Sequence, residues 1–148
     1  MKKKSIHYKY IFFFGFKMDN KMIIASKTDN LQKVEKFIDN FSAEHDIDEE
    51  LYGNLLIAAL EATNNAITHG NKLDERKNVE LSLVKEDEKI LLAVKDEGNG
   101  FDYQNLPDPT SPENIENMSG RGVFLMSRLS DKIVFENNGS FVKMIFFI

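Results

Sequence analysis

Three polar side chains recur at every fourth position in one stretch of the chain. Glu61, Asn65 and His69 belong to the segment Glu-Ala-Thr-Asn-Asn-Ala-Ile-Thr-His-Gly-Asn (61–71), and this spacing places them on one face of a helix. Asn is unfavourable inside a helix because its side chain competes for backbone hydrogen bonds. The column therefore indicates chemistry: a carboxylate can accept a proton, and a carboxamide oxygen can bind Mg²⁺.

A second polar feature, Asp96-Glu-Gly-Asn-Gly, comes at the end of a predicted strand. Gly98 and Gly100 are separated by one residue, a spacing that favours positive φ angles and close backbone approach. Asp96 is able to accept a hydrogen bond from an amine of a ligand. Taken alone, the same five residues are equally consistent with a tight turn.

The third feature, Gly120-Arg121-Gly122, opens a predicted short helix. Free amides and the positive end of the helix dipole favour phosphate at such a position, and Arg121 can add a charged fork or can be a simple surface cation. Asn65 could instead cap a neighbouring loop. We expect His69 to bond a carbonyl group at the helix end rather than a ligand.

The helix that carries the first feature is predicted to begin after an N-cap at Asp48. Gly70 is predicted to end it by adopting a left-handed backbone conformation directly after the helix. Its opposite face is narrow enough to lie close against a sheet, since it consists of a leucine and small residues: Leu55, Ala59, Ala62 and Ala66.

Hydrophobic patterning predicts the remaining elements. A capping box at Asp29 and Gln32 is expected to start another helix. Alternating or apolar segments predict a short strand at 22–26 and a hairpin of strands 79–83 and 90–94 with its turn at 85–89. A short helix is predicted at 123–129. A final pair of strands, 132–136 and 141–148, is predicted around the turn signal Asn138-Gly139. We expect an α+β fold, a two-layer sandwich with helices on one face of a mixed, mainly antiparallel sheet.

Composition narrows the function. The chain has 148 residues, 42% of them hydrophobic, no cysteine, and three histidines without metal-ligand spacing, so we expect neither disulfides nor a zinc site. Residues 1–21 carry six of the 19 basic and one of the 24 acidic residues, which leaves a net charge of −10 for residues 22–148. An acidic body disfavours nucleic-acid binding.

The chain divides into an extension and one domain. Residues 1–21 are basic and aromatic, and their apolar run is too short for a signal peptide or a membrane span; we expect a misassigned start codon or an extra edge strand. Residues 22–148 are expected to form one cytoplasmic domain with no membrane partner. Within it, 103–119 is irregular and proline-rich, as functional loops often are.

The three polar features, in this order, resemble the Bergerat ATP-binding fold of the GHKL superfamily, which gyrase, the histidine kinases and MutL share. The nearest likeness is to the anti-sigma-factor serine/threonine kinase branch. The resemblance covers residues 22–148 and rests on Glu-x-x-x-Asn-Ala-x-x-His-Gly, Asp-x-Gly-x-Gly-Phe-Asp and Gly-Arg-Gly-x-Phe-Leu-Met. Other nucleotide motifs, including the P-loop, are absent from the sequence.

The resemblance implies ATP and Mg²⁺ as cofactors and a role for each motif. Glu61 would be the general base, Asn65 the Mg²⁺ ligand and Asp96 the acceptor for adenine; 103–119 would be a lid over the nucleotide. The remaining nucleotide-binding positions would be in the two glycine loops: Gly98, Gly100, Gly120, Arg121 and Gly122.

The resemblance also implies partners. The expected function is phosphorylation of a serine on an anti-anti-sigma (STAS-like) protein, together with sequestration of a sigma factor, in a possible homodimer. The alternative is a catalytically silent ATP-binding module that sequesters a regulatory partner. Histidine autokinase activity is disfavoured, because the chain is too short to supply a separate phosphoacceptor domain.

Overall fold

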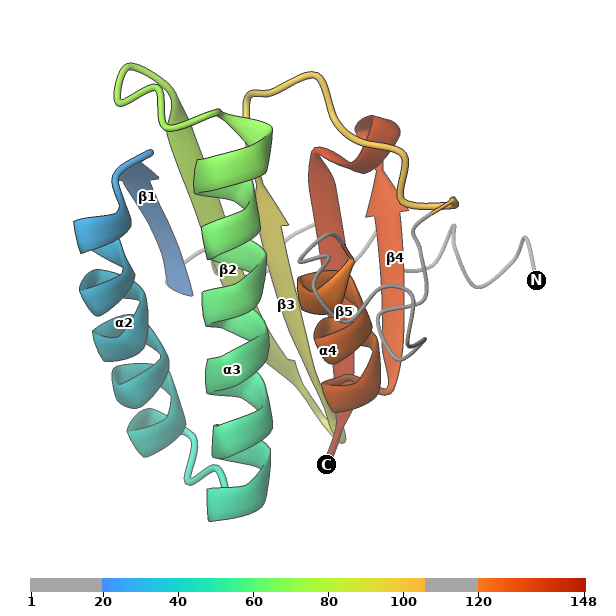
Figure 1. Cartoon of the computed structure of the whole chain (residues 1–148). Helices are drawn as coiled ribbons and strands as arrows, with labels where there is room; N and C mark the ends of the chain where they lie inside the picture. Colours follow the sequence, from blue (N-terminus) through green and yellow to red (C-terminus); the bar gives the residue numbers. More distant parts are fainter. Residues whose placement is uncertain (1–19, 106–119) are drawn as a thin grey trace.

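The strands form one five-stranded sheet in the order β1-β2-β3-β5-β4 (Figure 1). The computed structural model describes residues 20–105 and 120–148. Every neighbouring pair of strands is antiparallel, so the expected α+β class is confirmed, and the parallel component of a mixed sheet is absent from the described strands. The strands are β1 (Lys21–Ala25), β2 (Asn78–Glu86), β3 (Lys89–Lys95), β4 (Lys132–Glu136) and β5 (Phe141–Phe147).

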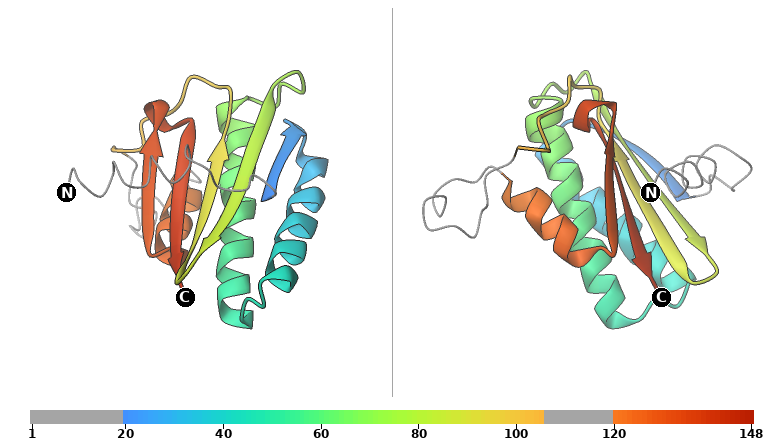
Figure 2. Two further views of the ribbon diagram at one scale, coloured as in Figure 1. Left: turned by 180° about the vertical axis from the view of Figure 1, so that it is seen from behind. Right: turned by 90° about the vertical axis from the view of Figure 1, so that its right-hand side faces the viewer.

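Three α-helices cover one face of this sheet (Figure 2): α2 (Leu31–Glu44), α3 (Glu49–Asn65) and α4 (Arg121–Leu129). The predicted cap of α3 is confirmed, because Asp48 Oδ1 accepts a hydrogen bond of 2.9 Å from the Leu51 amide. The predicted capping box of α2 is wrong. A 3-10 turn takes up Thr28–Asn30, and Asn30, the N-cap residue, donates to the Ala25 carbonyl group instead.

The core lies between α3 and the sheet. The predicted narrow face of α3 is buried, as are the alternate residues of β2, and the small alanine side chains allow the helix to approach the strands closely. The buried residues of these two faces are Leu55, Ala59, Ala62, Ala66, Val79, Leu81 and Leu83. The core therefore holds α3 where its polar edge faces α4.

Two hairpin turns connect neighbouring strands of the sheet, one between β2 and β3 and one between β4 and β5. The turn between β2 and β3 is shorter than predicted: Lys85 and Glu86 still pair with β3, and only Asp87 and Glu88 lie outside the ladder. The turn predicted at Asn138-Gly139 is confirmed between β4 and β5; Asn138 has a φ of 57° and Gly139 a φ of 95°. This second turn also contributes to the candidate site.

The predictions for residues 1–19 and 106–119 lie outside the described residues, which include only the start of the expected lid. The division into an extension and a domain stays a prediction. Within residues 20–105 and 120–148, no helix combines the length and apolar character needed to cross a membrane.

Candidate functional site

A cavity of about 230 Å³ lies between the helices and the sheet. This is smaller than the roughly 300–1,000 Å³ of pockets that enclose a drug-sized ligand, so the enclosed part suits a flat heterocycle rather than a whole nucleotide. Its walls are mainly apolar and come from the helices, the strands and the loop after β3: Ala62, Ala66, Val94, Phe101, Val123, Met126, Phe135 and Val142. Five predicted site residues also line it: Asn65, Asp96, Gly100, Gly120 and Gly122.

Asp96 is the buried charge of this cavity. It is 9% exposed, its Oδ1 accepts a hydrogen bond of 2.8 Å from the Gly98 amide, and its own amide donates to the Ser140 carbonyl group at 2.9 Å. Burial raises the pKa of Asp96, and the Gly98 amide and the Lys77 ammonium group offset part of that effect. A carboxylate held in this way can accept a hydrogen bond from an amine inside an apolar cavity.

Close packing explains the glycines around Asp96. A Cβ atom on Gly70 would lie 2.8 Å from Asp96 Oδ1 and nearer still to Cγ, and one on Gly98 would overlap the Gly70 carbonyl group. The predicted left-handed conformation of Gly70 is wrong, because the positive φ angles after the helix belong to Lys72 and Leu73. Glycine is required at position 70 by the approach of Asp96 and not by the backbone angle.

Gly100 joins the loop after β3 to the turn between β4 and β5. Its φ is 83°, and a Cβ atom on it would lie 2.7 Å from the carbonyl carbon of Asn138. The amide of Phe101 donates to the same carbonyl group at 2.7 Å. The hairpin turn therefore holds the end of the Asp96–Phe101 loop, whereas Gly70 packs against its start.

Helix α3 changes its winding at the cavity. A π turn spans Ala66–Gly70, and the Asn71 amide bonds the Ala66 carbonyl group five residues back, at 2.8 Å. The wider turn means that His69 does not stack directly below Asn65, as a regular helix would place it. His69 is exposed and still lines the cavity.

The first turn of α4 packs against the polar edge of α3. A Cβ atom on Gly122 would lie 2.7 Å from Asn65 Nδ2 and 3.1 Å from Glu61 Oε2, so both side chains point at this glycine. Gly120 precedes the helix with a φ of 84°. Glu61 does not line the cavity itself, and Arg121 is exposed at the start of α4. The predicted base, metal ligand and phosphate loop are thus neighbours.

An aromatic cluster at one side of the cavity was not predicted. The ring of Tyr103 stacks on that of Phe135 with centroids 4.8 Å apart, and Phe101 meets Phe135 edge-on at 5.6 Å. Phe135 lies on β4, 34 residues from Phe101 in the sequence, so periodicity alone had no means of pairing them. The cluster holds the start of the predicted lid against the sheet.

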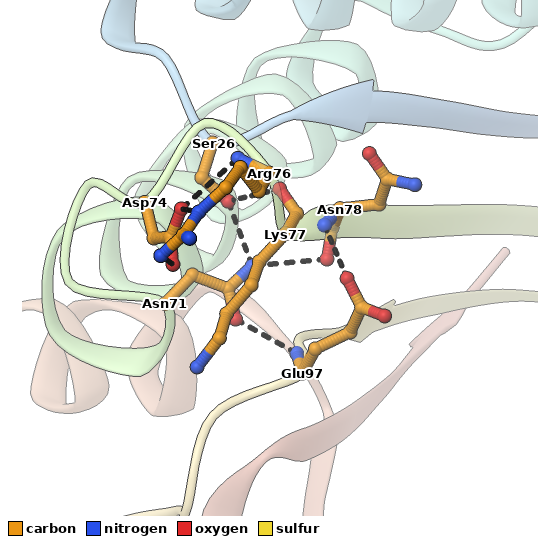
Figure 3. Close-up of polar contacts among 7 residues, drawn as sticks. All are labelled: Ser26, Asn71, Asp74, Arg76, Lys77, Asn78 and Glu97. Atoms are coloured by element: carbon orange, nitrogen blue, oxygen red, sulfur yellow. Dashed lines mark hydrogen bonds and ion pairs between the residues drawn. The ribbon is translucent and has the colours of Figure 1, made fainter.

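Asn71 also received no role from the sequence. It is 1% exposed, and its carboxamide bonds three separate segments, at Ser26, Asn78 and Glu97 (Figure 3). Ser26 Oγ in turn donates to the Lys77 carbonyl group at 2.7 Å. A signal was present in the sequence, since Asn71 directly follows the His-Gly of the first motif, but its partners are distant along the chain.

Metal binding in the described part of the chain would depend on few protein ligands. Residues 20–105 and 120–148 contain no group of three His, Cys, Asp or Glu side chains placed to hold a metal ion. A Mg²⁺ ion that is bound through nucleotide phosphates and waters needs only one or two protein oxygens. The Asn65 carboxamide beside Gly122 fits that requirement.

Comparison with known proteins agrees with this geometry. The model of the histidine kinase-like ATPase domain matches residues 24–146. The chain is 32% identical to the serine-protein kinase RsbW of Staphylococcus epidermidis over 104 residues, which cover 62% of this chain and 63% of that protein. For RsbW of Bacillus subtilis the identity is 31% over 91 residues, 57% of each chain.

A third relative is the anti-sigma F factor of Geobacillus stearothermophilus, 37% identical over 81 residues, which cover 52% of this chain and 54% of that protein. The matched regions thus span less than two thirds of the length of each of these relatives. The resemblance predicted from the three motifs is confirmed.

Proposed function

Because the chain belongs to the family of histidine kinase-like ATPase domains, we propose that it binds Mg²⁺·ATP and transfers the γ-phosphoryl group to a serine of a protein partner. The observation that carries this proposal is the meeting of Glu61, Asn65 and Gly122 beside the cavity that contains Asp96. Order along the chain and position in space agree, which unrelated caps and turns have no reason to do.

Adenine occupies the apolar cavity in this proposal. Its exocyclic amine donates to the buried carboxylate of Asp96, and its faces pack against residues such as Val94 and Met126. The phosphates extend towards the first turn of α4, where free amides and the helix dipole favour negative charge. Gly120 and Gly122 leave room there, since a side chain at 122 would collide with Asn65.

Asn65 and Glu61 act on the reacting phosphate. The Asn65 oxygen holds Mg²⁺, which when bound neutralises charge on the phosphate oxygens. The Glu61 carboxylate accepts the proton of the attacking serine hydroxyl group as the oxygen bonds to phosphorus and ADP leaves. One turn of helix separates the two residues, so base and metal ligand share a rigid support.

The names of the relatives support a proposal for the partners. Relatives named as a serine-protein kinase and as an anti-sigma factor support an anti-sigma-type switch, in which the serine belongs to an anti-anti-sigma (STAS-like) protein and the sequestered protein is a sigma factor. A homodimer and a location in the cytoplasm belong to the same proposal. Neither nucleic acid nor a membrane is part of it.

The test is transfer of labelled γ-phosphate from ATP to a purified anti-anti-sigma (STAS-like) protein. We expect transfer by the wild type and none by Glu61→Ala, with ATP affinity retained in both. If the wild type binds Mg²⁺·ATP and the partner without phosphorylating it, the alternative holds: a silent module in which ATP only shapes the binding surface.

A further inference from the structure

Asn71 is a buried polar residue whose hydrogen bonds are all made within the protein. Its Nδ2 group donates to Ser26 Oγ at 2.7 Å and to the Asn78 carbonyl group at 2.9 Å, and its Oδ1 accepts from the Glu97 amide at 2.8 Å (Figure 3). Both donor hydrogens and one acceptor position of the carboxamide are therefore used. With 1% of the residue exposed, water does not replace any of these partners easily.

The three partners come from different parts of the fold. Ser26 directly follows β1, Asn78 begins β2, and Glu97 lies in the loop just after β3. Asn71 itself follows the π turn at the end of α3. One carboxamide thus connects the end of the helix to three strand ends at the edge of the sheet next to the cavity.

The hydrogen bond between Asn71 and the Glu97 amide also restrains Asp96, the residue before Glu97. The Glu97 amide belongs to the peptide group that joins it to Asp96, and the amide of Asp96 is held by the Ser140 carbonyl group at 2.9 Å. Two consecutive peptide groups are therefore fixed, one by Ser140, which directly precedes β5, and one by Asn71. Gly70, the neighbour of Asn71, packs against the Asp96 carboxyl group at the same time.

We propose that Asn71 is a positioning residue for base recognition: by holding the Asp96–Glu97 peptide group, it aims the Asp96 carboxylate into the cavity. This inference rests on the proposed function, because Asp96 is taken to read the exocyclic amine of adenine. Asn71 does not line the cavity and acts only through Asp96. The pair Gly70-Asn71 then sets both the packing of the Asp96 side chain and the course of its backbone.

A variant at Ser26 distinguishes a positioning role of Asn71 from a merely stabilising one. It shares the buried cluster and bonds Asn71, but it makes no hydrogen bond to Glu97 or Asp96. Ser26→Ala is therefore a matched control that weakens the cluster and leaves the bond from Asn71 Oδ1 to the Glu97 amide in place. Asn71→Ala removes that bond and leaves the Glu97 amide without its acceptor.

The first experiment is amide hydrogen exchange without nucleotide, followed residue by residue by NMR. We expect the Glu97 amide to be protected in the wild type and in Ser26→Ala, and to exchange about two- to tenfold faster in Asn71→Ala. An unprotected Glu97 amide in the wild type overturns the proposal, and this result does not depend on any variant folding.

The second experiment compares the affinities for ATP and ITP, whose base has a carbonyl group in place of the exocyclic amine. We expect the preference for ATP to fall about fivefold or more in Asn71→Ala, and to persist in Ser26→Ala even if that variant melts earlier. An unchanged ATP-to-ITP ratio in folded Asn71→Ala overturns the proposal, because a merely stabilising residue does not alter base discrimination.

The two experiments also distinguish this inference from the proposed function. If the wild type binds neither nucleotide, the proposed function fails. Faster exchange of the Glu97 amide in Asn71→Ala then still supports the anchoring of the loop by Asn71.

Discussion

Gly70, at the end of the π turn, packs directly against the carboxyl group of Asp96, at the end of β3. A Cβ atom at position 70 would lie 2.8 Å from Asp96 Oδ1 and closer to its Cγ. This contact, which only glycine permits, fixes the position of two segments relative to each other. One is the helix that carries Glu61 and Asn65, and the other is the loop that carries Asp96.

Replacing Gly70 tests this contact. We expect Gly70→Ala to displace the Asp96 carboxylate, to lower ATP affinity by roughly tenfold or more, and to cost about 1–3 kcal/mol of folding free energy through overpacking. Isothermal titration and denaturant unfolding measure the two effects. The matched control is Gly53→Ala in α3, where a Cβ atom would meet nothing within 4 Å; it should stabilise the fold by up to about 1 kcal/mol and leave ATP affinity unchanged.

Gly122→Ala is expected to separate stability from activity. Alanine favours the first turn of α4 by about 0.5–1 kcal/mol, but its Cβ would lie 2.7 Å from Asn65 Nδ2 and 3.1 Å from Glu61 Oε2. Thermal stability should hold or rise while phosphoryl transfer falls at least roughly tenfold, since small displacements of reacting groups are costly. Transfer at the wild-type rate would show that this glycine does not adjoin the reaction.

We expect the difference in folding stability between the wild type and Asp96→Asn to depend on pH. Burial raises the pKa of Asp96 above 3.8, so between 3.8 and the raised value the folded protein binds more protons than the unfolded chain. The stability of the wild type relative to Asp96→Asn should therefore be greatest at acid pH and decrease as the pH rises through that window. Unfolding both proteins at a series of pH values checks the sign, and a constant difference contradicts it.

Removal of the metal tests Asn65. We expect the ATP affinity of the wild type to fall on addition of EDTA, and that of Asn65→Ala to be low already and insensitive to EDTA. Asn64→Ala is the matched control, because this neighbouring asparagine does not line the cavity. An EDTA response in Asn65→Ala equal to that of the wild type would assign the metal to other ligands.

Asp48→Ala should affect the fold alone. The lost hydrogen bond to the Leu51 amide caps α3 at the end far from the cavity, so we expect a loss of about 1 kcal/mol of folding free energy and an unchanged affinity for ATP. Denaturant unfolding and nucleotide titration measure both. A changed affinity would mean that fraying of α3 reaches the site.

The sequence by itself was sufficient for the local features. Hydrophobic periodicity, capping residues and turn residues predicted α3 with its cap at Asp48, the alternating strand β2 and the turn at Asn138-Gly139. The α+β class followed from these elements. Each signal depends on neighbours only a few residues apart. The three motifs were recognised in their order along the chain. Their roles in binding and catalysis stay predictions.

Tertiary contacts alone decided why particular residues are required. Gly70 is needed for the approach of Asp96 and not for a left-handed backbone, and Asn71 bonds Ser26 and Glu97, 45 and 26 residues away. Such contacts leave no periodic signal in the sequence, since their partners come together only when the strand ends meet beside the π turn. The physical reason is steric and polar complementarity between distant segments, which exists only in the folded chain.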